Sequence, residues 1–143
     1  MSADGDFALD PRLAADSHFI GDGPLSQLRL VDDARYDWLV LVPRVAGAVE
    51  WFGMAPAQQR LLLDEVGRAC AELEATARCE KLNIGTLGNI VRQLHVHVLA
   101  RNTGDPAWPG PAWGASPLQR RSESERDAAI AAWQLAFRLG DPP

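Results

Sequence analysis

The sequence has only two cysteines, no long apolar run and no excess of basic residues, and each of these absences excludes a class of protein. Its apolar stretches fall far short of the ~18 residues that a membrane-spanning helix needs. The N-terminus is acidic and lacks the basic and long apolar regions of a signal peptide, so we expect a cytoplasmic protein without a membrane partner. Cys70 and Cys79 have no further partners for a disulfide framework or a metal site, and we interpret them as buried free thiols.

The charge balance argues against nucleic acid as a partner. The 19 acidic residues outnumber the 14 lysines and arginines, which gives a net charge of −5. Proteins that bind phosphate backbones instead present clusters of lysine and arginine. A small phosphate ligand stays compatible with this composition, because a pocket can be positive on a protein that is acidic as a whole.

The length of 143 residues and the apolar content of 47% fit a single domain. Residues 1–16 show little periodicity and predict a partly ordered arm, followed by one domain over residues 17–140. Glycine and proline at 21–24 separate two short apolar stretches and predict a hairpin. A continuous apolar run at 38–42, closed by Pro43, predicts a strand that is buried on both faces.

The second half of the chain predicts a helix and two further strands. From Pro56 onward, apolar residues recur every three or four positions, which indicates an amphipathic helix of about five turns. Residues 81–85 form a short strand in this interpretation. Polar and apolar residues alternate over 93–101 and predict a half-buried strand. Residues 102–117 are rich in proline and glycine and predict irregular structure.

A last helix is expected to begin near Ser122, which can form a capping box with Glu125, and to end at Gly140. The sequence shows no internal repeat and no linker. Several antiparallel strands combined with two helices predict an α+β fold.

The strand over 93–101 carries the most informative pattern in the chain. Gln93, His95 and His97 share one face of a strand, and successive residues of that face lie roughly 6.5–7 Å apart. This spacing lets two imidazoles reach one phosphoryl group. Histidine has an unperturbed pKa of about 6.5, so a neutral imidazole can attack phosphorus while a neighbouring imidazolium protonates the leaving oxygen.

Two other interpretations of the histidine pair remain open. The two residues can share a face by chance, without any role. They can also form part of a metal site, since His-x-His on a strand is a common ligand pair. That site needs further ligands, and His18 is distant in sequence.

Residues 93–99, Gln-Leu-His-Val-His-Val-Leu, resemble the signature of the histidine triad (HIT) superfamily, His-φ-His-φ-His-φ-φ, where φ is apolar. Glutamine stands in place of the first histidine. The order of expected elements over residues 17–114 is also similar to the whole family domain. Residues 108–114, Trp-Pro-Gly-Pro-Ala-Trp-Gly, resemble a bacterial branch of the family that carries this glutamine form.

The resemblance implies a fold of about five antiparallel strands and two helices, usually assembled as a homodimer. It implies substrates of the form nucleoside–phosphate–X, such as dinucleoside polyphosphates or nucleoside phosphoramidates. The enzymes of the family are hydrolases or nucleotidyl transferases that act at the α-phosphate through a nucleotidyl-histidine intermediate. No cofactor is required, although the substrate can carry a divalent cation.

The resemblance also assigns roles within the motif. It implies that His95 is the nucleophile, and that His97 contacts the scissile phosphate and assists the leaving group. Gln93 occupies the first position, which in relatives supports the nucleophile partly through its backbone. Because Gln93 departs from the motif, a nucleotide-binding protein with weak or lost catalysis is a second functional hypothesis. A metal-binding protein that uses His95 and His97 is the third.

Outside the motif, the resemblance places phosphate-binding residues at Gly88 and Asn89. It places the asparagine of the preceding strand end at Asn83. An acidic residue after the first hairpin holds the ribose hydroxyls in relatives, and Asp32 is the first candidate for this role, ahead of Asp33.

Further side chains are candidates for the predicted site or its surroundings. Arg101 shares strand parity with His95 and can offset phosphate charge. Trp108 can stack on a base, as can Trp113, although both can equally pack a loop. Trp38 stands where many relatives carry a further histidine.

Overall fold

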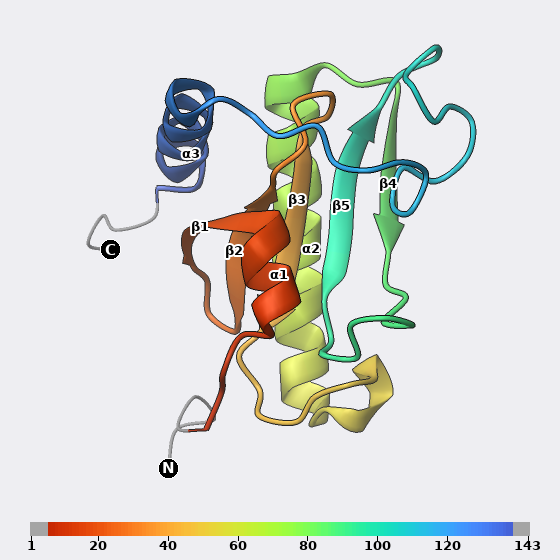
Figure 1. Cartoon of the computed structure of the whole chain (residues 1–143). Helices are drawn as coiled ribbons and strands as arrows, with labels where there is room; N and C mark the ends of the chain where they lie inside the picture. The colour runs from red at the N-terminus through yellow and green to blue at the C-terminus, as the bar shows by residue number, and fades with distance from the viewer. Residues whose placement is uncertain (1–5, 139–143) are drawn as a thin grey trace.

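The computed structural model describes residues 6–138 of the chain (Figure 1). In chain order the elements are α1 (Pro11–Asp16), β1 (Ser17–Asp22), β2 (Ser26–Val31), β3 (Trp38–Pro43), the 3₁₀ helix η1 (Trp51–Gly53), α2 (Pro56–Ala77), β4 (Lys81–Gly85), β5 (Val96–Arg101) and α3 (Glu123–Phe137). The strands form one antiparallel sheet in the order β1-β2-β3-β5-β4. This architecture confirms the predicted α+β class.

The local signals explain most of these elements. The Gly-Pro turn joins β1 to β2 as a hairpin, and every residue of β3 is buried, as its continuous apolar run predicts. The helix α2 carries Pro56 in its first turn, where the missing amide hydrogen has no helical partner to lose. The predicted capping box of α3 is present, because the Ser122 hydroxyl accepts from the Glu125 amide and the Glu125 carboxylate accepts from the Ser122 amide.

The sheet has two covered faces. Helix α2 runs along one face, while α1 and the segment between β5 and α3 lie over the other (Figure 1). Along β5, Val96 and Val98 join the apolar cluster around α2, whereas Leu99 joins a second cluster on the opposite face. Side chains alternate along a strand, so His97 points to the same face as Leu99, away from α2.

The predicted arm contains a helix that the sequence interpretation missed. Asp10 caps α1 by accepting a hydrogen bond from the Arg12 amide at 2.8 Å, and Pro11 begins the helix. An acidic cap followed by proline is a recognised helix start. The signal was therefore present, but six residues are too few to show periodicity. Helix α3 ends at Phe137, three residues before the predicted end at Gly140. Gly140 itself and residues 1–5 lie outside the described residues.

The predicted strand over 93–101 is shorter than expected, because β5 begins at Val96. Just before it, the Leu94 amide bonds to the Ala48 carbonyl at 2.9 Å instead of to a neighbouring strand. The strand is also buried on both faces, not half-buried, because covering segments occupy the face that the sequence pattern left to solvent.

Cys70 and Cys79 are free thiols, as expected, but both are only partly buried. None of the helices within residues 6–138 is long and apolar enough to cross a membrane.

Candidate active site

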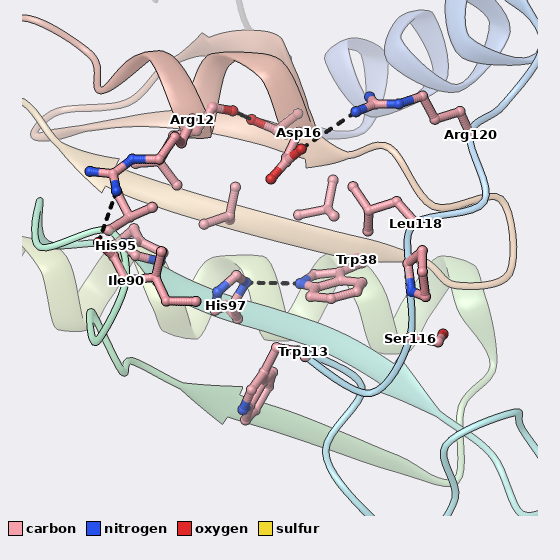
Figure 2. A pocket seen from close by; sticks show the side chains of 17 residues that line it. Arg12, Asp16, Trp38, Ile90, His95, His97, Trp113, Ser116, Leu118 and Arg120 are labelled. Atoms are coloured by element: carbon pink, nitrogen blue, oxygen red, sulfur yellow. Dashed lines mark hydrogen bonds and ion pairs between the residues drawn. The ribbon is translucent and has the colours of Figure 1, made fainter.

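A cleft of about 620 Å³ opens on the sheet face opposite α2. Trp38 and Val40 of β3 and His97 of β5 form its floor, with His95 at the approach to β5. Helix α1 and residues 113–118 form its walls (Figure 2). A smaller hollow of about 260 Å³ shares both histidines with the cleft and is also lined by residues 87–91.

The two histidines lie side by side at the junction of these cavities. Their ring centroids are 5.1 Å apart and the rings are nearly perpendicular, at 82°. Gly88 and Asn89 line the smaller hollow beside them. The structure therefore brings His95 and His97 together with the two residues that the resemblance assigns to phosphate binding.

The tautomer of His95 is set by a contact with the backbone of Gln93. Its Nδ1 lies 2.7 Å from the backbone oxygen of Gln93. A carbonyl oxygen only accepts hydrogen bonds, so Nδ1 carries the proton and Nε2 keeps a lone pair when the ring is neutral. His95 is only 7% exposed, yet its ring lines the cleft. This tautomer suits a nucleophile.

The side chain of Gln93 bonds to the segment before α1, not to His95. Its amide donates to the Ala8 carbonyl at 2.8 Å and accepts from the Asp10 amide at 2.8 Å. These two bonds hold the segment before α1 against Gln93, which precedes β5 in the chain. The backbone of Gln93 thus supports His95, while the side chain positions the N-terminal wall of the cleft.

His97 is held by aromatic rings. The indole N–H of Trp38 donates to Nδ1 of His97 at 2.9 Å, and Trp113 stacks on the imidazole with centroids 5.5 Å apart (Figure 2). Burial, and secondarily the charge of His95, lowers the pKa of His97 to about 4. At neutral pH His97 is therefore uncharged with its proton on Nε2, and the expected imidazolium acid is not present at this position. The sequence interpretation missed this because it took the ordinary histidine pKa.

Of the two tryptophans that follow β5, Trp113 lines the cleft and Trp108 does not. A Cβ on Gly85 would lie 2.6 Å from the Trp113 ring, so the missing side chain of Gly85 makes room for the stack. Trp108 instead lies over the Arg101 guanidinium, whose carbon is 5.7 Å from the ring centroid, and does not line the cleft.

Arg101 also lies away from the cleft, contrary to the sequence expectation. It is 1% exposed and forms two bonds to the Asp105 carboxylate, at 2.7 and 2.8 Å. A third bond, at 2.9 Å, goes to the side-chain oxygen of Asn83. Arg101 lies on the sheet face that strand parity predicts, but its guanidinium is paired with Asp105 in the loop that follows β5, and the Asn83 side chain is bonded to Arg101.

The candidate ribose-binding acid is likewise engaged by protein groups. The buried Asp32 accepts from the Arg121 amide at 3.1 Å and from the Arg120 side chain at 3.3 Å, and it pairs with His18 at 3.1 Å. Asp33 pairs with Arg35 at 2.8 Å. Neither carboxylate lines the cleft.

Two arginines that the sequence interpretation missed do line the cleft. Arg12 of α1 donates to the Ile90 carbonyl at 3.1 Å, and Arg120 pairs with Asp16 at 3.4 Å. Among the described lining residues, these two cations face one acid, Asp16. Each arginine is also paired with a carboxylate, Arg12 with Asp10 at 3.0 Å and Arg120 with Asp32 at 3.3 Å, so an anionic ligand would compete with these acids for the two guanidinium groups.

The described residues contain no group of three or more histidine, cysteine, aspartate or glutamate side chains that is placed to hold a metal ion.

The chain is similar to known proteins over most of its length. The HIT domain family matches residues 12–104. A histidine triad protein from Sinorhizobium meliloti is 47% identical, with 88% of this chain and 93% of that chain covered and a TM-score of 0.85. One from Bradyrhizobium japonicum is 43% identical, with 91% and 97% covered and a TM-score of 0.86. One from Marinobacter aquaeolei is 38% identical, with 94% and 98% covered and a TM-score of 0.90. No curated protein matches the chain.

Proposed function

Because the chain belongs to the HIT domain family, we propose that it is a nucleotide hydrolase or nucleotidyl transferase that uses His95 as its nucleophile. The substrate has the form nucleoside–phosphate–X, and the reaction takes place at the α-phosphate. The observation that carries this proposal is the hydrogen bond from Nδ1 of His95 to the Gln93 carbonyl, which leaves Nε2 as the nitrogen with a free lone pair.

The proposed first step is an attack by His95 on the α-phosphorus. A bond forms between Nε2 and phosphorus, and the bond between phosphorus and X breaks with its electron pair on X. The resulting imidazolium keeps its hydrogen bond to the Gln93 carbonyl, which stabilises the new positive charge. Water then attacks phosphorus, the nitrogen–phosphorus bond breaks and the proton of water passes to solvent. A second alcohol or phosphate in place of water gives transfer.

The surroundings of the histidines support the binding of a nucleotide. Arg12 and Arg120 on the cleft walls favour a phosphate chain. Trp113 offers an aromatic face beside the reacting group. Gly88 and Asn89 are proposed to contact the phosphate from the smaller hollow. We propose that Asp32 binds the ribose only in a state in which the bond between the Arg120 side chain and the Asp32 carboxylate is broken.

We also propose that the protein is a homodimer. The strand β4 is an edge of the sheet, and its Ile84 side chain is 56% exposed. Leu87, which follows β4, is 52% exposed. A second copy that covers these apolar side chains would remove them from water. Light scattering of the purified protein measures the oligomeric state.

The test of the catalytic proposal is the replacement His95→Ala and His95→Asn, with Arg92→Ala as an exposed neighbouring control. Release of nucleoside monophosphate is measured on dinucleoside polyphosphates and nucleoside phosphoramidates. We expect both His95 variants to lose turnover and to lose the acid-labile nucleotide adduct that mass spectrometry detects on the wild-type chain. Unchanged turnover in the His95 variants would end the proposal.

The alternative of a binding module gains little from the structure, because the Gln93 backbone supplies the contact to His95. Calorimetry with nucleoside monophosphates favours that alternative if binding is firm while no substrate turns over. Stoichiometric metal in the purified protein, together with loss of activity in chelator, would favour the metal-binding alternative.

A further inference from the structure

The hydrogen bond between Trp38 and His97 restricts the chemistry that His97 can perform. Trp38 is 4% exposed on β3, and its Nε1 lies 2.9 Å from Nδ1 of His97. An indole N–H can only donate a hydrogen bond. Nδ1 of His97 therefore presents a lone pair to Trp38, and the ring proton of neutral His97 is on Nε2.

Protonation of His97 is opposed by this arrangement. A second ring proton would point from Nδ1 at the indole N–H, so that two donors would face each other at the distance of a hydrogen bond. Trp113 covers one face of the imidazole and His95 lies 5.1 Å away, and neither offers a negative charge to a cation. Asp16, the one acid among the described residues of the cleft lining, is paired with Arg120 on the wall. The low pKa of His97 agrees with this geometry.

A neutral imidazole can donate a hydrogen bond but is a very weak acid. It can stabilise the negative charge on a phosphate oxygen through Nε2–H, without giving up its proton. A leaving group of low basicity, such as the phosphate end of a nucleotide or polyphosphate, departs as an anion and needs no more than this. An amine in a phosphorus–nitrogen bond has to receive a proton as it leaves.

Resting on the proposed nucleotidyl transfer, we propose that Trp38 makes this site selective for nucleoside phosphoanhydrides over nucleoside phosphoramidates. In the anhydride reaction, the bond from Nε2 of His95 to phosphorus forms while the bridging phosphorus–oxygen bond breaks. The electron pair goes to the leaving phosphate, whose oxygen accepts a hydrogen bond from Nε2–H of His97, and no proton is transferred. In the phosphoramidate reaction the amine nitrogen would have to leave without a proton from His97.

The expected selectivity follows from the contribution of a missing general acid. Such an acid contributes about 10²- to 10⁴-fold to a reaction that needs it, so we expect kcat/KM for the anhydride to exceed that for the phosphoramidate by about that factor. Diadenosine tetraphosphate and adenosine 5′-phosphoramidate are matched probes, because both deliver the same adenylyl group to His95.

Trp38→Phe tests the role of the indole N–H, since phenylalanine keeps an aromatic ring in the core but donates no hydrogen bond. We expect this variant to narrow the ratio of the two kcat/KM values by at least tenfold, with phosphoramidate turnover that rises toward acid pH. Trp38→His places a hydrogen-bond acceptor opposite Nδ1 of His97, and we expect it to narrow the ratio of the two kcat/KM values further. Trp51→Phe is the matched control, because Trp51 lies in η1 outside the cleft lining, and should leave the ratio unchanged.

Nitrogen-15 NMR of the wild-type protein gives a measurement that does not depend on the variants folding. We expect His97 as the Nε2–H tautomer, with no imidazolium at pH 6. An imidazolium at neutral pH, or equal rates of His95 adduct formation from both probes, would refute the selectivity while leaving the nucleophile in place. Absence of the adduct and of turnover with every probe would refute the proposed function, and the selectivity with it.

Discussion

Removal of the Gln93 side chain should weaken substrate binding more than it slows the chemical step. Gln93→Ala deletes two hydrogen bonds of 2.8 Å, to the Ala8 carbonyl and from the Asp10 amide. At a net ~0.5–1.5 kcal/mol each, the segment before α1 loses about 1–3 kcal/mol of docking free energy. The contact from the residue 93 carbonyl to Nδ1 of His95 does not need the side chain and persists.

The size of the kinetic effect follows from this loss. Arg12 and Asp16 of α1 line the cleft, so a loss of docking free energy can weaken substrate binding. If the full ~1–3 kcal/mol is lost from binding, KM rises by about 5- to 140-fold. We expect KM to rise within that range while kcat changes by less than about threefold. Hydrogen exchange monitored by mass spectrometry should show faster exchange over residues 8–16, because the segment opens locally.

Arg92→Ala is the control for the Gln93 variant, because it removes an exposed neighbouring side chain that bonds to no part of α1 in the described structure. The reasoning would be refuted if Gln93→Ala lowered kcat tenfold or more at unchanged KM, since the side chain would then take part in the reaction. Unchanged exchange over residues 8–16 would refute the docking role separately.

Two further predictions concern the support of the cleft. Gly85→Ala places a methyl group 2.6 Å from the Trp113 ring, so we expect the stack on His97 to be displaced, at a cost of about 1–3 kcal/mol in denaturant unfolding, and nucleotide binding measured by calorimetry to weaken. Burial raises the pKa of Asp32, but bonds from the Arg121 amide, His18 and Arg120 outweigh it and leave the pKa below its usual value. A lowered folded-state pKa stabilises the fold above the unfolded value of about 3.9 and loses that contribution as pH falls below it. Urea unfolding of Asp32→Asn should thus show a deficit of about 1.5–3 kcal/mol at pH 7 that shrinks below pH 4, and a deficit independent of pH would contradict the assignment.

The fate of the charged residues shows where sequence patterns stop being informative. Strand parity placed Arg101 on the face of the sheet that carries the cleft, which is the correct face. The same residue is four positions before Asp105, and the loop between them folds back so that the two side chains pair. Periodicity describes the direction of a side chain from its own strand, and it does not describe the loop that covers the strand.

Local sequence signals account for the elements whose causes lie within a few residues of the chain. The turn residues of the hairpin and the apolar run of β3 act within a few residues, so they predict structure without knowledge of the rest of the chain. Alternation over 93–101 predicts a strand there too, but β5 begins only at Val96 and is buried on both faces. The spacing of His95 and His97 also belongs to this class, because one extended backbone segment places both rings. The match to the HIT family extends well beyond this pattern, over residues 12–104.

The chemistry open to each histidine depends on contacts between distant parts of the chain. Trp38 reaches His97 because β3 pairs with β5 in the register that sets Val40 opposite His97, and the two residues are 59 positions apart in sequence. Gln93 reaches Ala8 across 85 positions. Hydrogen bonds between distant side chains depend on strand register and on which segments cover a sheet face, and neither is encoded in hydrophobic periodicity. The tautomers of both imidazoles, and the walls of the cleft, are therefore properties of the packed fold.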